Sequence, residues 1–203
     1  MKKERVIIIG AGLGGLECGY ILAKNGMKVT VLERETQVGG CLQTFRRGAA
    51  LFDTGFHYVG ALDEGEALHT LFSYFDLMGL PWKRLDEDCF DEVVIGEEAF
   101  AFANKHQRFY ERMSARFPKE REGLMKYVNF IQQVGNHIFD SFHVQNDGAF
   151  TDSLFACSAY DFLDETIKDP LLRKVLSGTS LKMELNASTL PLYTFAQIND
   201  SFI

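Results

Sequence analysis

Six residues near the start of the chain, GAGLGG at positions 10–15, have the types and spacing that bind a phosphate group. Gly10, Gly12 and Gly15 match the pattern G-x-G-x-x-G. The first glycine of this pattern permits a tight turn, the second lets the backbone approach a pyrophosphate, and the third lets a helix pack closely on a strand. Glu33 follows at the distance expected of an acid that accepts a hydrogen bond from a ribose 2′-hydroxyl. Because that carboxylate would repel a 2′-phosphate, the site disfavours NADP.

Two strands and a helix must position these residues. Residues 5–9 form a β-branched run typical of a buried parallel strand, residues 13–25 have a helical pattern, and residues 28–33 predict a second strand. The start of a helix directs unpaired N–H groups and positive potential at a bound phosphate, which adds Leu13 and Gly14 to the predicted binding residues. The order strand, glycine turn, helix, strand predicts a βαβ unit that binds a dinucleotide.

The rest of the chain has a different, mainly helical pattern. Residues 34–50 are rich in glycine and basic residues and predict an extended loop. Further elements are expected as helices over 67–78, 105–116, 118–142, 160–167 and 170–176, a hairpin over 90–103 that turns near Gly96-Glu97, and a loop over 146–151. A Rossmann sheet needs more parallel strands than two. We therefore expect the remaining strands to lie in sequence outside these 203 residues.

The predicted fold class is α/β, a Rossmann-like βαβ unit with an inserted, mostly helical α+β region and a sheet that is incomplete in this chain. Residues 1–62 are expected to form the N-terminal part of the dinucleotide-binding domain. Residues 63–203 are expected to form an aromatic-rich, substrate-side region, since 15 of the 18 phenylalanines lie between Phe52 and Phe162. Helix 118–142 has an apolar stripe that either lines a tunnel or packs in a core.

Composition excludes several classes of protein. The net charge of −7 argues against a broad nucleic-acid surface. The four cysteines form no CxxC pair and no histidine cluster accompanies them, so a metal site is not expected and a reduced, cytoplasmic setting fits. No apolar run approaches the roughly 20 residues of a membrane span, so the chain is expected to be soluble or peripheral to a membrane.

Two further segments resemble a known family. Glu33, the basic Arg34 and the pair Gly39-Gly40 resemble the FAD-binding start of the phytoene desaturase, carotenoid isomerase and amine oxidase superfamily. Residues 52–60, FDTGFHYVG, are similar to the corresponding segment of the retinol saturase (all-trans-retinol 13,14-reductase) branch. Members of the family are about twice this length or more, so the resemblance covers an N-terminal part.

This resemblance implies an FAD-dependent oxidoreductase of the desaturase, saturase or isomerase type. Its substrate would be an apolar polyene or isoprenoid, met at a peripheral membrane contact. The flavin performs the hydride or electron transfer, and the protein supplies position and electrostatics. The resemblance adds Arg34, Gly39 and Gly40 to the cofactor-binding residues, because the glycine pair lets the chain pass close to the cofactor. His57 is a weak candidate for steering a proton; the alternative is a histidine packed beside its aromatic neighbours.

Two other functions stay open at this point. The first is an NAD-dependent dehydrogenase, with NAD in place of FAD and the middle region as catalytic domain. Gly39-Gly40 and the lack of a second βαβ unit speak against it. The second is a dinucleotide-binding fragment without catalytic activity.

Overall fold

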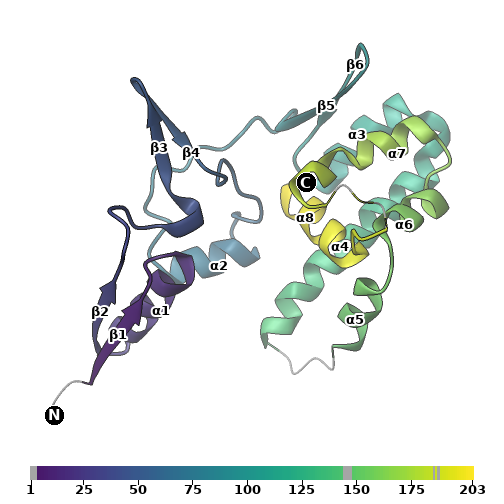
Figure 1. Cartoon of the computed structure of the whole chain (residues 1–203). Helices are drawn as coiled ribbons and strands as arrows, with labels where there is room; N and C mark the ends of the chain where they lie inside the picture. The colour runs from purple at the N-terminus through teal and green to yellow at the C-terminus, as the bar shows by residue number, and fades with distance from the viewer. Residues whose placement is uncertain (1–3, 144–147, 185, 187) are drawn as a thin grey trace. The chain divides into compact units, whose positions relative to one another are not determined.

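The computed structural model describes residues 4–143, 148–184, 186 and 188–203 (Figure 1). The chain divides into two compact units, Met1–Val59 and Gly60–Ile203. The division falls a few residues before the boundary at 62/63 expected from the sequence. Each unit is described by itself.

The first unit begins with the predicted βαβ arrangement. Strand β1 (Arg5–Ile9) leads through the glycine turn into helix α1 (Leu13–Lys24), and strand β2 (Lys28–Leu32) follows. The two strands pair in parallel, with Arg5 opposite Lys28 and each following residue in step. This is the Rossmann-like fold that the sequence predicts.

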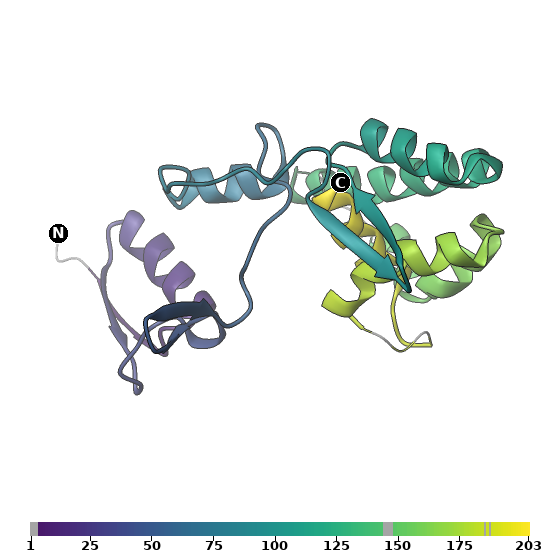
Figure 2. The ribbon, with the colours of Figure 1, turned by 90° about the horizontal axis from the view of Figure 1, so that it is seen from above.

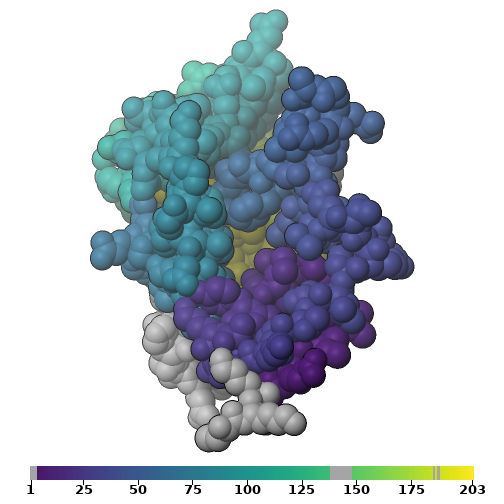
Figure 3. Space-filling view, turned by 90° about the vertical axis from the view of Figure 1, so that its left-hand side faces the viewer, coloured from purple at the N-terminus to yellow at the C-terminus, as the bar shows by residue number. Residues whose placement is uncertain are grey.

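Helix α1 covers one face of the two-stranded sheet. Gly19 brings the helix close to this face, where Ile8 and Val31 have atoms 3.5 Å from the position that a Cβ would take. The opposite face carries Ile7 and Ile9, whose exposed fractions are 68% and 89%. Parallel sheets are normally covered on both faces. The β1–β2 sheet is therefore incomplete within the described residues; Figure 3 shows part of the surface of this unit in purple and blue.

A turn and a hairpin follow β2, where the sequence predicts an extended loop. The short 3₁₀ helix η1 (Gly40–Leu42) precedes the antiparallel strands β3 (Thr44–Arg47) and β4 (Ala50–Asp53). The loop prediction is wrong over these residues, for two physical reasons. Gly48, at φ 60°, adopts a left-handed conformation that permits a tight turn, and the rings of Phe45 and Phe52 stack across the strands at 5.4 Å.

The second unit is mainly helical, with one hairpin (Figure 2). In chain order its elements are α2 (Ala67–Tyr74), β5 (Asp91–Ile95), β6 (Glu98–Phe102), α3 (His106–Arg116), η2 (Pro118–Glu120), α4 (Arg121–His143), α5 (Ala149–Phe155), α6 (Ala159–Thr166), α7 (Pro170–Leu176), η3 (Gly178–Lys182) and α8 (Leu192–Phe202). The β5–β6 hairpin turns at Gly96-Glu97 as predicted and forms a sheet of its own. It therefore adds no strand to β1–β2 in the part of the chain described.

Helix α4 carries the apolar stripe predicted from the sequence, and the stripe is core. Leu124, Tyr127, Ile131 and Val134 are fully buried, and the ring of Tyr127 contacts that of Phe195 in α8. Between the two alternatives for this stripe, the structure favours packing over a tunnel. The side chains of residues 138–143, which include the end of the stripe, lie outside the description.

Two helices of this unit are absent from the sequence prediction. Residues 149–151, expected to be loop, begin α5, whereas 146 and 147 lie outside the described residues. Helix α8 is held by burial of Leu192, Phe195 and Ala196 rather than by local propensity. The pattern around it contains β-branched and aromatic residues that local rules do not assign to a helix.

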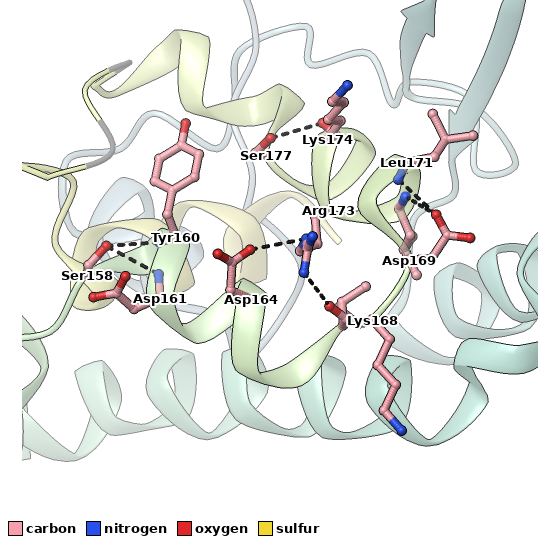
Figure 4. Close-up of polar contacts among 12 residues, drawn as sticks. Ser158, Tyr160, Asp161, Asp164, Lys168, Asp169, Leu171, Arg173, Lys174 and Ser177 are labelled. Atoms are coloured by element: carbon pink, nitrogen blue, oxygen red, sulfur yellow. Dashed lines mark hydrogen bonds and ion pairs between the residues drawn. The ribbon is translucent and has the colours of Figure 1, made fainter.

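Side-chain caps fix where α6 and α7 begin (Figure 4). The Ser158 hydroxyl accepts hydrogen bonds from the N–H groups of Tyr160 and Asp161, at 3.2 and 3.3 Å. The Asp169 carboxylate accepts one from the N–H of Leu171 at 2.8 Å. These caps satisfy N–H groups that the first turn of a helix leaves unpaired. Among the described helices, none is long and apolar enough to cross a bilayer.

Candidate dinucleotide-binding site

The chain leaves β1 through a turn that requires glycine. Gly10 has φ 99°, a left-handed conformation that side chains other than glycine rarely adopt. Its N–H donates a hydrogen bond of 2.7 Å to the carbonyl of Leu32, at the end of β2. The turn is thus fixed to the neighbouring strand at the carboxyl edge of the sheet, where open α/β sheets bind their ligands.

The other glycines of the motif differ in what surrounds them. A Cβ on Gly15 would lie 2.1 Å from the Gly10 carbonyl oxygen, so only glycine allows α1 to approach β1 this closely. A Cβ on Gly14 would meet no atom within 4 Å, and one on Gly12 would meet only the Gly40 Cα, at 3.9 Å. The space over the first turn is therefore open, and a diphosphate fits the residues that surround it.

The start of α1 offers backbone donors that have no partner within the helix. Gly12 is the N-cap residue, and the N–H of Leu16 donates 3.0 Å to its carbonyl. The N–H groups of Leu13, Gly14 and Gly15 precede this first helical bond and have no partner inside the helix. The first turn holds no acidic residue. An anion placed here gains both the free donors and the positive end of the helix dipole.

The Glu33 carboxylate, just after β2, is bonded to the glycine turn that follows β1. One oxygen accepts a hydrogen bond of 2.7 Å from the Ala11 N–H, and the other accepts one of 2.9 Å from the Glu35 N–H. These donations, first from Glu35 and then from Ala11, lower the pKa of Glu33 below its usual value. The carboxylate is therefore ionised at neutral pH and held next to the glycine turn.

The glycine pair after β2 returns to the same turn. The N–H of Gly39 donates 2.8 Å to the Ala11 carbonyl, and Gly39 forms a parallel bridge with Gly12. Gly39 and Gly40 have φ angles of 112° and 58°, and a Cβ on Gly40 would press on the Gly12 Cα at 3.1 Å. The structure therefore brings Gly10, Gly12, Leu13, Gly14, Gly15, Glu33, Gly39 and Gly40 to one place.

The side chains of two predicted site residues are exposed to solvent. The Arg34 side chain is 92% exposed, and its guanidinium pairs with the Glu35 carboxylate at 2.8 Å. His57 is exposed in the segment that follows β4. The cofactor role of Arg34 and the proton-steering role of His57 stay predictions.

Sequence reasoning missed two contacts of this site. The bond between Glu33 and Ala11 joins residues far apart in the sequence and has no local signal. The Thr54 hydroxyl lies 2.6 Å from the Cys41 carbonyl and 2.8 Å from that of Gln43. The turn at Gly48 between two phenylalanines was the available signal for the hairpin that carries Thr54.

Comparisons with known proteins agree with this geometry. The family described as NAD(P)-binding Rossmann-like domain matches residues 8–75. All-trans-retinol 13,14-reductase from Homo sapiens is 32% identical over 139 residues, which cover 66% of this chain and 23% of the relative. The reductase of the same name from Danio rerio is 33% identical over 137 residues, covering 66% and 22%. Prolycopene isomerase from Daucus carota is 25% identical over 136 residues, covering 66% and 22%.

Over about two thirds of its length the chain is therefore similar to retinol reductases and a carotenoid isomerase. The retinol saturase and carotenoid isomerase resemblance expected from the sequence is confirmed. The matched part spans less than a quarter of the length of each of these relatives.

Solved structures support the fold of this family. Cyclohexylamine oxidase from Brevibacterium oxydans aligns with a TM-score of 0.57 and 20% identity, over 97% of this chain and 41% of that one. A triple mutant of putrescine oxidase aligns with a TM-score of 0.60 and 19% identity, over 96% and 40%. At this identity the likeness concerns the fold alone.

Proposed function

We propose that the first unit binds the ADP half of FAD and that the protein is an FAD-dependent oxidoreductase acting on an apolar polyene. The observation that carries the proposal is the meeting of the open glycine turn, the ionised Glu33 and the Gly39-Gly40 pair at the carboxyl edge of β1 and β2. The turn offers donors to a diphosphate, and Glu33 offers acceptors to a ribose. The site therefore offers partners to both the diphosphate and the ribose of ADP.

Each group has a distinct part in this proposal. The N–H groups of Leu13, Gly14 and Gly15 donate to the diphosphate oxygens. The open space at Gly12 leaves room for the diphosphate. Each Glu33 oxygen accepts one backbone N–H and keeps a further lone pair for a ribose hydroxyl. The carboxylate repels a 2′-phosphate, which disfavours NADP. When bound, the flavin supplies the hydride or electron transfer.

The substrate class is proposed from the relatives. Their names give all-trans-retinol and prolycopene as the molecules on which they act, and both names denote polyenes. An apolar polyene partitions into lipid, so a peripheral contact with a membrane is part of the proposal. His57 is the residue of the first unit proposed to steer a proton.

Titrations of the full chain with four probes test the cofactor. We expect FAD and ADP to bind, FMN, which lacks the ADP half, to bind poorly, and NADH to bind no more tightly than ADP alone. Tighter binding of NADH than of ADP and FAD would favour an NAD-dependent dehydrogenase. Binding of ADP without any retention of flavin would favour a dinucleotide-binding fragment.

The experiment that tests the proposed substrate uses the flavin-loaded protein. All-trans-retinol is added under anaerobic conditions with reduced flavin, and the shortening of the conjugated chain is followed by absorbance. Loss of the polyene band with wild-type protein supports the proposal. No spectral change with a protein that retains its flavin would contradict the polyene assignment while leaving the cofactor proposal intact.

A further inference from the structure

Thr54, just after the β3–β4 hairpin, lies next to the turn that leads away from the glycine pair. Its hydroxyl oxygen is 2.6 Å from the Cys41 carbonyl oxygen and 2.8 Å from that of Gln43, and its N–H donates to Gln43 at 3.3 Å. The single hydroxyl proton serves one of these acceptors or is shared between them. Both carbonyls belong to the 3₁₀ turn or to the residue that follows it.

The turn that Thr54 holds is directly connected to the proposed diphosphate site. The Leu42 N–H donates 3.0 Å to the carbonyl of Gly39, and the Gly39 N–H donates 2.8 Å to that of Ala11. Gly40, the first residue of the turn, lies beside Gly12, where a Cβ would come within 3.1 Å of the Gly12 Cα. A shift of the turn would therefore move Gly39 and Gly40 against the glycine motif.

On its other side, Thr54 is anchored to the end of the β3–β4 hairpin. Thr54 follows the last residue pair of the hairpin, Thr44 opposite Asp53. The stacked rings of Phe45 and Phe52 hold the two strands together at 5.4 Å. The hydroxyl thus joins the hairpin end to a turn that contains two glycines in left-handed conformations, which have no side chains of their own to hold the turn in place.

Two glutamine amides also hold this segment, and one of them reaches the first residue of β3. The Gln43 side chain donates 2.9 Å to the Gln37 carbonyl, and the Gln37 side chain donates 3.2 Å to the Thr44 carbonyl. These bonds tie the segment 37–44 to itself. Thr54 differs because it follows β4, outside segment 37–44, and its hydroxyl reaches the carbonyls of Cys41 and Gln43.

We propose that Thr54 is a positioning residue for the diphosphate site, acting through the Cys41 and Gln43 carbonyls on Gly39 and Gly40. This inference rests on the proposed function, because it concerns the same site. The side chain acts by fixing where the glycine pair lies against Gly12, and it need not contact the nucleotide. Its effect is on the second phosphate more than on the adenosine part.

The test uses the full 203-residue chain, with ADP and AMP as probes measured by calorimetry. Thr54→Val removes the hydroxyl and keeps the branched shape, and Thr54→Ser keeps the hydroxyl. Thr30→Val, on the exposed face of β2 in the same unit, is the matched control. The thermal midpoint of each variant, followed by circular dichroism, separates binding from unfolding.

We expect Thr54→Val to weaken ADP about five- to tenfold, the effect of one hydrogen bond. AMP, which ends before the second phosphate, should change less than about twofold. Thr54→Ser should bind ADP like wild type, and Thr30→Val should change neither ligand. If Thr54→Val does not fold, Thr54→Ala removes the same hydroxyl without placing a second methyl group beside the carbonyls.

Two results would overturn the inference alone. The first is wild-type ADP affinity in a folded variant without the hydroxyl. The second is an equal loss for ADP and AMP together with a fall in the thermal midpoint, which indicates a merely structural role. A wild-type chain that binds neither ADP nor FAD would overturn the proposed function and the inference with it.

Discussion

The Glu33 carboxylate accepts a 2.7 Å hydrogen bond from the Ala11 N–H and so ties the end of β2 to the turn that follows β1. The same carboxylate accepts the Glu35 N–H at 2.9 Å. An acid that in this fold family faces a ribose therefore also holds the glycine turn in place. The stability of the turn and the binding of the nucleotide share one ionisable group.

Replacement of Glu33 by glutamine should lower stability at neutral pH and lower it less in acid. The pKa of Glu33 is lowered in the folded chain, so its contribution is present above its unfolded pKa and is lost as the pH falls through the folded pKa. Urea unfolding should give Glu33→Gln a lower midpoint than wild type at pH 7, and the difference should shrink as the pH is lowered through the folded pKa of Glu33. Glu35→Gln, which changes the exposed partner of Arg34, is the control. A difference that grows in acid would contradict the assignment.

Replacement of Gly12 by valine should abolish nucleotide binding while the chain stays folded. The branched side chain would occupy the open space over the first turn, next to Gly40, whose Cα lies 3.9 Å from the Cβ position. We expect ADP to weaken by at least about 100-fold in calorimetry, a loss of roughly 2.7 kcal/mol. Gly79→Val, at an open position in the second unit, should bind ADP like wild type. Undiminished flavin or ADP binding by the folded Gly12→Val chain would refute this placement of the diphosphate.

In the second unit, Gly135 and Asp200 lie too close for any side chain at 135. A Cβ there would lie 1.7 Å from an Asp200 carboxylate oxygen, whose other oxygen is 2.7 Å from the His106 ring. Gly135→Ala should therefore destabilise the chain by about 1–3 kcal/mol in urea unfolding.

A double-mutant cycle supplies the control for this pair. In an Asp200→Ala background the carboxylate is removed and only the Cβ of residue 200 stays close, at 3.1 Å, so Gly135→Ala should cost clearly less than in the wild type. Equal costs in the two backgrounds would show that the contact does not carry the effect.

The hydroxyl of Tyr127 is fully buried and has no hydrogen-bond partner among the described residues. Burial and the nearby Asp200 carboxylate raise the pKa of this phenol well above its usual range. Because Tyr127→Phe breaks no hydrogen bond, we expect it to change the free energy of unfolding by less than about 1 kcal/mol or to stabilise the chain. Tyr127→Ala, which also removes the ring contacts to Phe109 and Phe195, should cost about 3–5 kcal/mol. A loss above about 2 kcal/mol in Tyr127→Phe would indicate a hidden partner.

The glycine turn at residues 10–15 could be predicted from the sequence, because the local backbone geometry requires glycine at defined positions of the motif. Gly10 needs a left-handed conformation and Gly15 a close approach, and both requirements belong to a spacing that can be read along the chain. The stripe of α4 was predictable for the same reason, since its spacing is helical. Its role as core could not be predicted, because a tunnel wall has the same pattern.

Other features depend on contacts that sequence patterns do not carry. Helix α8 is fixed by burial of Phe195 against α4, and the closeness of Gly135 to Asp200 joins residues on two separate helices. The β3–β4 hairpin was hidden by Arg46 and Arg47, which make its alternation look like a basic loop. Tertiary packing overrides local preference at such places.

The most direct measurement is a map of backbone amide shifts in the full chain, labelled with ¹⁵N and titrated with ADP. The account predicts the largest shifts for the amides of Gly12, Leu13, Gly14 and Gly15, with smaller ones at Ala11 and Gly39, and little change in the second unit. Saturable ADP binding that leaves these amides unmoved, or that shifts only residues beyond 60, would contradict the account.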